Sequence, residues 1–292
     1  MHRKSNRPGN FKKTVVAITT ALSVGACGSS PGSHPQAVFP KDKSLMTEPV
    51  PFKTSDSILE KFQQRKVLQE GPGYISQAAV SAGGKSILVT VFNPRMYNLE
   101  HINPNTVTSP NEVNQLNYWA VFNGDFFAIG NEAPLFQNRY GTPYGPVVSN
   151  GFDNDKGDIT QWGFFAISNQ GFPRCSRPNE TEDLSNEKFV VGAENQPYMI
   201  DGRANGAAVE SWRSANALGQ TNRSIIAATN QGYVVLIAST GISRAELLDM
   251  FNGTPIVCAN SLDSGSSTFG HAGSVTVAAN PNKSRTLLGI AP

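Results

Sequence analysis

Three short stretches of the sequence place polar side chains directly beside an apolar run, where a strand end can present chemical groups to a cleft on a rigid support. Asn123, Gly124 and Asp125 follow the run YWAVF. Arg223 precedes the run IIAAT, and residues 260–268, which read NSLDSGSST, follow PIVCA. Each stretch taken alone is also typical of an ordinary turn, because Asn, Asp, Ser and Gly are turn-forming residues.

The side chains in these stretches are of types that handle an anionic substrate. Asp125 and Asp263 are candidates for a general base or a nucleophile. The guanidinium of Arg223 can pair with two oxygens of a phosphate at once. The third stretch offers backbone N–H groups and hydroxyls of the kind that form phosphate-binding nests, and the residues concerned are Ser264, Gly265, Ser266 and Ser267.

The elements that must position these groups are mostly short strands, because apolar or alternating runs recur with Asn, Gly and Pro between them. Gly83 and Gly84 mark a hairpin, and two helices are predicted, one within residues 55–66 and one after the capping box that begins at Ser243. The strands are too close together for alternating helices, which disfavours a doubly wound parallel sheet. The expected fold class is therefore α+β, a single domain of mostly antiparallel strands with a few short helices.

The N-terminal residues indicate export and lipid attachment. Five basic residues precede the apolar stretch TVVAITTALSVGA, which is shorter than the roughly 20 residues of a membrane-spanning helix. Residues 24–27 resemble the lipobox of bacterial lipoproteins, so residues 1–26 are predicted to be a signal peptide and Cys27 to be lipidated. A plain secreted protein is the alternative. Residues 27–54, rich in Pro, Ser and Gly, are predicted to be a flexible tether to a domain at 55–292.

The expected location is therefore extracytoplasmic, with a lipid anchor in the bacterial cell envelope. Loss of residues 1–26 would remove five of the 24 basic side chains and none of the 22 acidic ones, which changes the net charge from +2 to −3. The basic character belongs to the targeting segment, so nucleic acid is not expected as a partner.

Cysteine and histidine usage gives no sign of a metal centre. His101 and His271 have no Cys or His at metal-ligand spacing, so neither a metal site nor a cofactor is predicted. Cys175 and Cys258 lie in a chain expected in an oxidising compartment, where disulfides persist. The sequence leaves open whether they are bridged, because the distance between their Cα atoms is not known from it.

Taken together and in order, the motifs resemble those of the phosphodiester glycosidases, whose animal member removes N-acetylglucosamine from a phosphodiester. The resemblance covers residues 118 to 288 and comprises NGDFF, PYGPVVSNG, QPYMIDGR, NRSIIAATNQGYVVLI, GISRAELLDMF and NSLDSGSST. The first is specific, and so is the last, which is similar to the family signature Asn-Leu-Asp-Gly-Gly-Gly-Ser. The resemblance implies a hydrolase that removes a sugar from a sugar-1-phosphate diester, with a glycan or sugar phosphate as its partner.

The resemblance also implies which residues form the site. Asp125 and Asp263 are the implied catalytic residues, and a single well-placed carboxylate is plausible because a phosphodiester is already a good leaving group. The implied substrate and phosphate contacts are Asn123, Gly124, Arg223, Ser264, Gly265, Ser266 and Ser267. Arg139 and Tyr140, which lie between two matching motifs, are weaker candidates for phosphate contact.

The last motif does not match the family pattern at every position. Ser261 stands where the pattern has Asn, and Ser264 stands where it has Gly. If the backbone at 264 needs positive φ or close approach to substrate, a Cβ there costs about 1 kcal/mol and narrows the pocket. This motivates the alternative of a non-catalytic envelope lipoprotein that binds an anionic glycan. Glu246 and Asp201 are explained by a helix cap and a hairpin turn.

Overall fold

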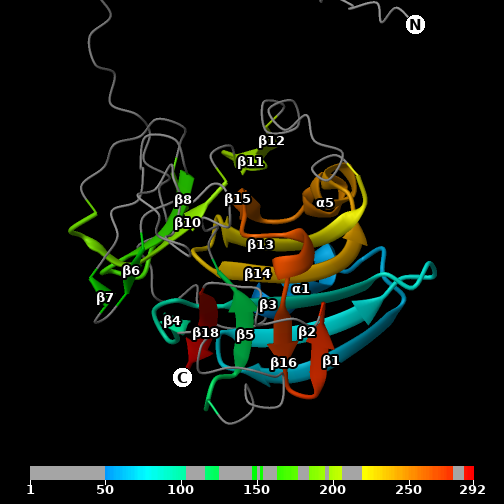
Figure 1. Cartoon of the computed structure of the whole chain (residues 1–292), viewed down its shortest axis with the longest axis horizontal. Coiled ribbons are helices and arrows are strands. Elements are labelled where there is room, and N and C mark those ends of the chain that lie inside the picture. The colour runs from blue at the N-terminus through cyan, green and yellow to red at the C-terminus, as the bar shows by residue number, and fades with distance from the viewer. Residues whose placement is uncertain are drawn as a thin grey trace, which may run out of the picture. The chain divides into compact units, whose positions relative to one another are not determined.

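The computed structural model describes residues 50–102, 116–124, 147–149, 152–153, 163–176, 184–194, 197–205, 219–278 and 286–292. All of them belong to one compact unit, Phe39–Pro292, which is drawn in Figure 1. The described residues form three sheets, two α-helices and a short 3-10 helix, and their strands pair antiparallel. The expectation of mostly antiparallel strands with few helices is confirmed. The described part is mainly β, so the α+β label is not confirmed.

The largest sheet has eight strands in the order β1-β2-β3-β14-β13-β15-β11-β12. These strands are β1 (Gln64–Gly71), β2 (Tyr74–Val80), β3 (Ser86–Phe92), β14 (Val234–Ile242), β13 (Thr221–Thr229), β15 (Ile256–Ser261), β11 (Met199–Ile200) and β12 (Arg203–Ala204). The predicted hairpin around Gly83 and Gly84 joins β2 to β3, with Val80 opposite Ser86. Asp201 and Gly202 both have positive φ, 51° and 73°, as a tight hairpin turn requires.

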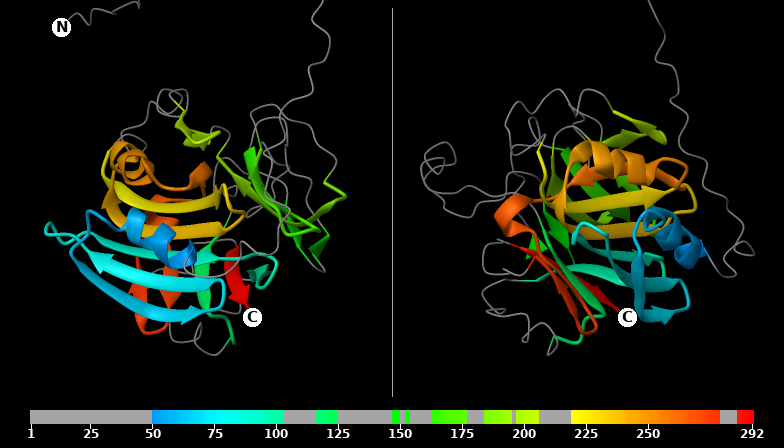
Figure 2. Two further views of the ribbon diagram at one scale, coloured as in Figure 1. Left: turned by 180° about the vertical axis from the view of Figure 1, so that it is seen from behind. Right: turned by 90° about the vertical axis from the view of Figure 1, so that its right-hand side faces the viewer.

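Two five-stranded sheets complete the β structure (Figure 2). The first has the order β7-β6-β10-β8-β9, with β7 (Phe152–Asp153), β6 (Val148–Ser149), β10 (Glu187–Ala193), β8 (Gly163–Ser168) and β9 (Pro173–Cys175). The second has the order β17-β16-β5-β18-β4, with β17 (Val275–Val277), β16 (Gly270–Ala272), β5 (Ala120–Asn123), β18 (Leu287–Ala291) and β4 (Asn98–Ile102).

The two faces of the eight-stranded sheet are buried against different partners, because successive side chains of a strand point to opposite faces. Ile225 and Ile237 pack on the side of the helices α1 (Val50–Ile58) and α5 (Arg244–Phe251). Ile226 and Leu236 pack on the other side, against residues from both smaller sheets. The central strands β13 and β14 are therefore apolar on both faces, and their polar side chains concentrate at one end.

One of the two predicted helices lies where the sequence placed it, and the other is shifted. At α5 the predicted capping box is present: Glu246 N–H donates to Ser243 Oγ at 3.2 Å, and Ser243 N–H donates to Glu246 Oε2 at 2.8 Å. The helix predicted within residues 55–66 lies earlier, at Val50–Ile58, and the chain enters β1 at Gln64. The helical spacing of Ile58, Leu59 and Phe62 predicted the wrong residues because Phe62 is buried in the core from the turn that follows the helix. Neither helix of the described residues has the length and apolarity that a bilayer crossing requires.

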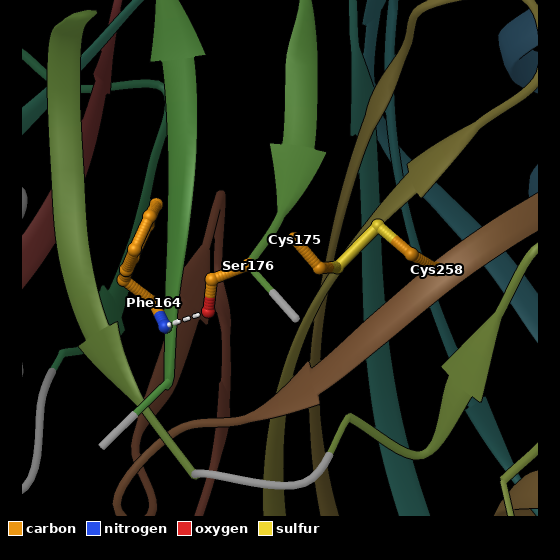
Figure 3. The surroundings of a disulfide bond; sticks show 4 residues. All are labelled: Phe164, Cys175, Ser176 and Cys258. Atoms are coloured by element: carbon orange, nitrogen blue, oxygen red, sulfur yellow. Dashed lines mark hydrogen bonds between the residues drawn. A yellow bond between two sulfur atoms is a disulfide. The ribbon is translucent and has the colours of Figure 1, made fainter. Parts of the chain in front are cut away.

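A disulfide joins two of the sheets, which settles the question that the sequence left open (Figure 3). Cys175 on β9 is bonded to Cys258 on β15, and their Cα atoms are 6.1 Å apart. Next to the bridge, Phe164 N–H donates a 2.7 Å hydrogen bond to Ser176 Oγ. The strand that leads into the DSGSS stretch is therefore covalently tied to the edge of a smaller sheet.

Candidate active site

Asn123 is the junction at which the three polar stretches meet. It is the fully buried last residue of β5. Its Nδ2 donates to the backbone carbonyl of Asp263 at 2.5 Å, and its Oδ1 accepts from Phe269 N–H at 2.9 Å. The hydroxyl of Ser224, next to Arg223 on β13, also donates to Oδ1. Residues more than 100 positions apart are thus held around one amide.

Gly124 completes this junction through its backbone. Asp263 N–H donates to the Gly124 carbonyl at 3.2 Å, and Gly124 N–H donates to the Thr286 carbonyl at 2.8 Å. A Cβ built on Gly124 would lie 2.2 Å from Thr286 Oγ1 and 3.2 Å from the Thr286 carbonyl oxygen. Glycine is therefore required by close packing here, a reason independent of the substrate contact that the motif suggests.

Asp263 lies two residues beyond the end of β15, with its carboxyl group largely buried. Burial raises the pKa of this carboxyl to about 6, although hydrogen bonds from the Ser267 hydroxyl and the Ser264 N–H counteract the rise. The group is thus predominantly ionised at pH 7 and yet more basic than an exposed aspartate. A carboxylate with these properties suits a general base or nucleophile.

The pKa of Asp263 predicts an acid limb in the pH dependence of activity. The base form is lost as pH falls through about 6, so kcat/KM should decline below that pH with a slope approaching one decade per pH unit. Initial rates between pH 4.5 and 8 at substrate concentrations below KM would measure it. A profile that stays level down to pH 4.5 would remove Asp263 from the role of base.

The backbone of the loop after Asp263 shows that positive φ is not needed at Ser264. Ser264 has φ −120° and ψ −175°, an extended conformation open to any residue, and positive φ occurs one position later, at Gly265 with 71°. The Ser264 hydroxyl donates to the Leu262 carbonyl at 3.0 Å and accepts from Ser224 N–H at 3.2 Å. The backbone therefore needs no glycine at 264, and the serine binds the loop to β13.

Gly265–Ser267 form the 3-10 helix that follows. Among the predicted nest residues, Ser267 is nearly buried and directed to the Asp263 carboxylate, whereas Ser266 is exposed. The structure therefore brings together Asn123, Gly124, Asp263 and Ser264, with Ser267 beside them.

Arg223 lies on the other face of β13 from Ser224, because the two residues are consecutive in a strand. Its side chain is almost fully buried, with Nε donating to the Ile242 carbonyl at 3.2 Å and Nη2 donating to the Gly219 carbonyl at 3.0 Å. Burial lowers the pKa of this guanidinium, and Tyr198 and Glu194 counteract that shift. Arg223 thus belongs to a buried polar cluster behind the strand end.

Three members of this cluster were not singled out from the sequence. Glu194 Oε1 lies 2.5 Å from Arg244 Nη2, and the Arg244 guanidinium carbon lies 4.8 Å from the centre of the Tyr198 ring. Burial raises the pKa of Glu194 to about 7, against the lowering effect of Arg244. The available signal was the position of Glu194, a charged residue directly after the apolar strand FVVGA.

Several predicted residues lie outside the part of the chain that the structure describes. They are Cys27, Asp125, Arg139 and Tyr140. Within the described residues, no group of three or more His, Cys, Asp and Glu side chains is arranged to hold a metal ion.

Comparison with known proteins adds a family and a fold. The sequence model of the phosphodiester glycosidases matches residues 117–289. A search of curated protein sequences found no match. The catalytic domain of zebrafish N-acetylglucosamine-1-phosphodiester alpha-N-acetylglucosaminidase, solved as auto-inhibited by its pro-peptide, is 13% identical, with a TM-score of 0.56 over 85% of this chain and 96% of that one.

A hypothetical protein from Synechocystis is 16% identical, with a TM-score of 0.54 over 78% of this chain. This chain spans 64% of that protein, which is less than two thirds of its length. At these identities both structures are similar to this one in fold.

Proposed function

The chain belongs to the phosphodiester glycosidase family, and on that premise we propose that it is a hydrolase that removes a sugar from a sugar-1-phosphate diester outside the cytoplasm. The observation that carries the proposal is the junction at Asn123, where Asn123 and Gly124 are hydrogen-bonded to the backbone of Asp263, whose carboxyl pKa is raised by burial. A structural turn would require neither the buried carboxylate nor the long-range amide contacts.

In the proposed reaction, the bond between the anomeric carbon and the phosphate oxygen breaks. Asp263 either accepts a proton from the attacking water or attacks the anomeric carbon itself, to be released by water in a second step. The phosphodiester departs as a phosphate monoester, whose low basicity reduces the need for a general acid. Asp125, adjacent to Gly124 in the chain, is the proposed second carboxylate.

The anion-binding part of the proposal rests on the loop after Asp263. The N–H groups of Gly265–Ser267 and the exposed Ser266 hydroxyl are the proposed donors to the departing phosphate. The Ser264 and Ser267 hydroxyls instead bind the Leu262 carbonyl and the Asp263 carboxylate. We keep Arg223 as the proposed cation of the site. Because its guanidinium is buried behind β13, it would stabilise the phosphate charge at a distance and would not pair with two phosphate oxygens directly.

The test is release of free sugar from a panel of sugar-1-phosphate diesters by residues 28–292. Reducing sugar and phosphate monoester should appear in equal amounts, and free inorganic phosphate should not. Equimolar sugar phosphate with a free alcohol would instead indicate cleavage of the phosphorus–oxygen bond on the other side, and would contradict the proposed glycosidase. Absence of turnover across the panel, with glycan retained in a pull-down, would favour the binding protein.

Ser264→Gly separates the enzyme from the alternative of a non-catalytic binding protein. Because Ser264 is unstrained and its hydroxyl bonds to the Ser224 N–H, the glycine variant should gain no hydrolysis and should lose about 1 kcal/mol of unfolding free energy. Urea denaturation and the sugar-release assay measure the two effects. A gain in hydrolysis would show that the serine had weakened an ancestral activity.

The location is also a proposal, namely attachment to the cell envelope through lipid on Cys27. The bridge between Cys175 and Cys258 supports it, because disulfides persist outside the reducing cytoplasm. Radiolabelled palmitate should be incorporated by bacteria that express the whole chain and should be absent from the Cys27→Ala variant. Equal labelling of both would disprove lipidation at Cys27.

A further inference from the structure

Glu194 and Arg244 form a buried ion pair that is poorly explained by stability. Their side chains are 1% and 4% exposed, and the closest oxygen and nitrogen are 2.5 Å apart. The desolvation penalty of such a pair often exceeds its attraction, so apolar residues of similar volume would serve the core at least as well. Arg244 is moreover the first residue of α5, where the helix dipole disfavours a cation.

The backbone around this pair holds β15 just before the candidate catalytic loop. Glu194 N–H donates to the Ser261 carbonyl at 3.0 Å, and Tyr198 N–H donates to the Ala259 carbonyl at 2.7 Å. Ser261 and Ala259 are on the strand that ends two residues before Asp263. Arg244 contacts both anchors, through the carboxylate of Glu194 and the ring face of Tyr198.

From Ser261 the contacts continue into the loop itself. The Ser261 hydroxyl donates to the Leu262 carbonyl at 3.0 Å, and its oxygen lies 3.3 Å from Ser264 Oγ. Ser264 in turn accepts from Ser224 N–H and supplies an N–H to the Asp263 carboxylate. A short chain of contacts therefore connects the N-terminus of α5 to the proposed reacting group, with Ser261 and Ser264 between the ion pair and Asp263.

We propose that Glu194 and Arg244 are positioning residues that fix loop 261–268, and with it the Asp263 carboxylate, in the geometry needed for turnover. This inference rests on the proposed hydrolase function. Misplacement of a reacting group by about 1 Å can cost about 100-fold in rate. The pair should therefore affect kcat/KM, because loop 261–268 carries both the Asp263 carboxylate and the proposed phosphate donors.

Amide hydrogen exchange tests the positioning without relying on activity. Residues 28–292 carrying Glu194→Gln should exchange the 261–268 amides about tenfold faster or more, since the Asp263 and Leu262 amides depend on the loop contacts. The amides of β3 should be unchanged. Asp249→Asn is the matched control, because it removes an exposed ion pair with Lys61 from the same helix. If amide exchange accelerated equally in β3 and in the loop, the pair would contribute only to global stability, and the proposal would be overturned.

Kinetics supply the second readout. Glu194→Gln should lower kcat/KM about 100-fold, with a fall in kcat as part of that loss, whereas Asp249→Asn should match the parent. Arg244→Lys, which keeps a cation against Glu194, should retain more activity than Arg244→Met. Faster loop exchange with unchanged kcat would overturn the proposal.

A double variant guards against misfolding. Glu194→Gln removes the negative charge that faces a buried guanidinium, which can unfold the protein, but Glu194→Gln combined with Arg244→Met removes both charges and is expected to fold. The double variant should keep the melting temperature of the parent, the fast loop exchange and the low kcat together. Recovery of parental exchange and kcat would overturn the proposal. If the parent cleaves no diester, the proposed hydrolase fails, and loop exchange alone decides whether the pair orders the loop.

Discussion

Asp263→Asn is expected to lower turnover by about 10²–10⁴-fold while the protein stays folded. The amide has the shape of the carboxylic acid, and its carbonyl oxygen can still accept a hydrogen bond from the Ser267 hydroxyl or the Ser264 N–H. It can neither take a proton from water nor attack an anomeric carbon. Sugar release from the best diester of the panel, followed at pH 7.5, is the measurement.

The pKa of Asp263 also predicts the direction of the stability effect. The folded-state pKa of about 6 lies above that of an unfolded aspartate, so the folded chain holds the proton more tightly. The resulting penalty is absent at pH values below the unfolded pKa, grows between the two pKa values and is complete above about pH 6. At pH 7.5 the asparagine variant should therefore be at least as stable as the parent.

Asp201→Asn is the control for this substitution. It makes the same chemical change at an exposed hairpin turn where φ is 51°, a conformation that Asn tolerates. Turnover by this variant should equal that of the parent. Parental activity in Asp263→Asn would remove Asp263 from the mechanism, and a large loss of stability would show that the aspartate is mainly structural.

The second large effect is expected on stability, from removal of the disulfide. Cys175 and Cys258 are 83 residues apart in sequence, and closing a loop of this size restricts the unfolded chain by about 4 to 5 kcal/mol in the chain-entropy account. Replacing both cysteines with Ser should lower the unfolding free energy by about 2–5 kcal/mol. Urea denaturation followed by tryptophan fluorescence would measure it.

The single-cysteine variants and the reduced parent serve as controls for the double serine variant. Reduction of the parent should shift the urea midpoint in the same direction as the double substitution, and reduction should not shift the double variant further. A loss below about 1 kcal/mol would mean that contacts between β9 and β15 already hold the two sheets together without the bridge.

The sequence predicted those features that depend on local chemistry. The capping box at Ser243, the hairpin at Gly83 and Gly84 and the turn at Asp201 all follow from side-chain hydrogen bonds or glycine-compatible dihedral angles within a few residues. The position of the first helix was predicted wrongly, because Phe62 is buried by the sheet that it packs against and not by lying on a helix face.

The sequence indicated which motifs form the candidate site, but it did not indicate the contacts between them. Asn123 and Gly124 of the first motif do contact Asp263 of the last, yet nothing local in either motif specifies that Asn123 binds the Asp263 carbonyl. The pairing of Glu194 with Arg244 could not be predicted either. Arg244 lies at the start of a helix whose capping box already explains the local sequence. Long-range polar pairs of this kind are decided by the whole fold.

The position of β18 has a consequence for how the molecule acquires its site. β18 lies between β5 and β4, and it contributes the residues opposite Asn123 and Phe122. The sheet that carries the Asn123 junction is therefore complete only after residue 291 has been synthesised. Because such pairing joins distant parts of the chain, folding should be slow and should follow synthesis rather than accompany it. A nascent chain that stalls before Leu287 would emerge with both motifs made and without the strand that pairs with Asn123.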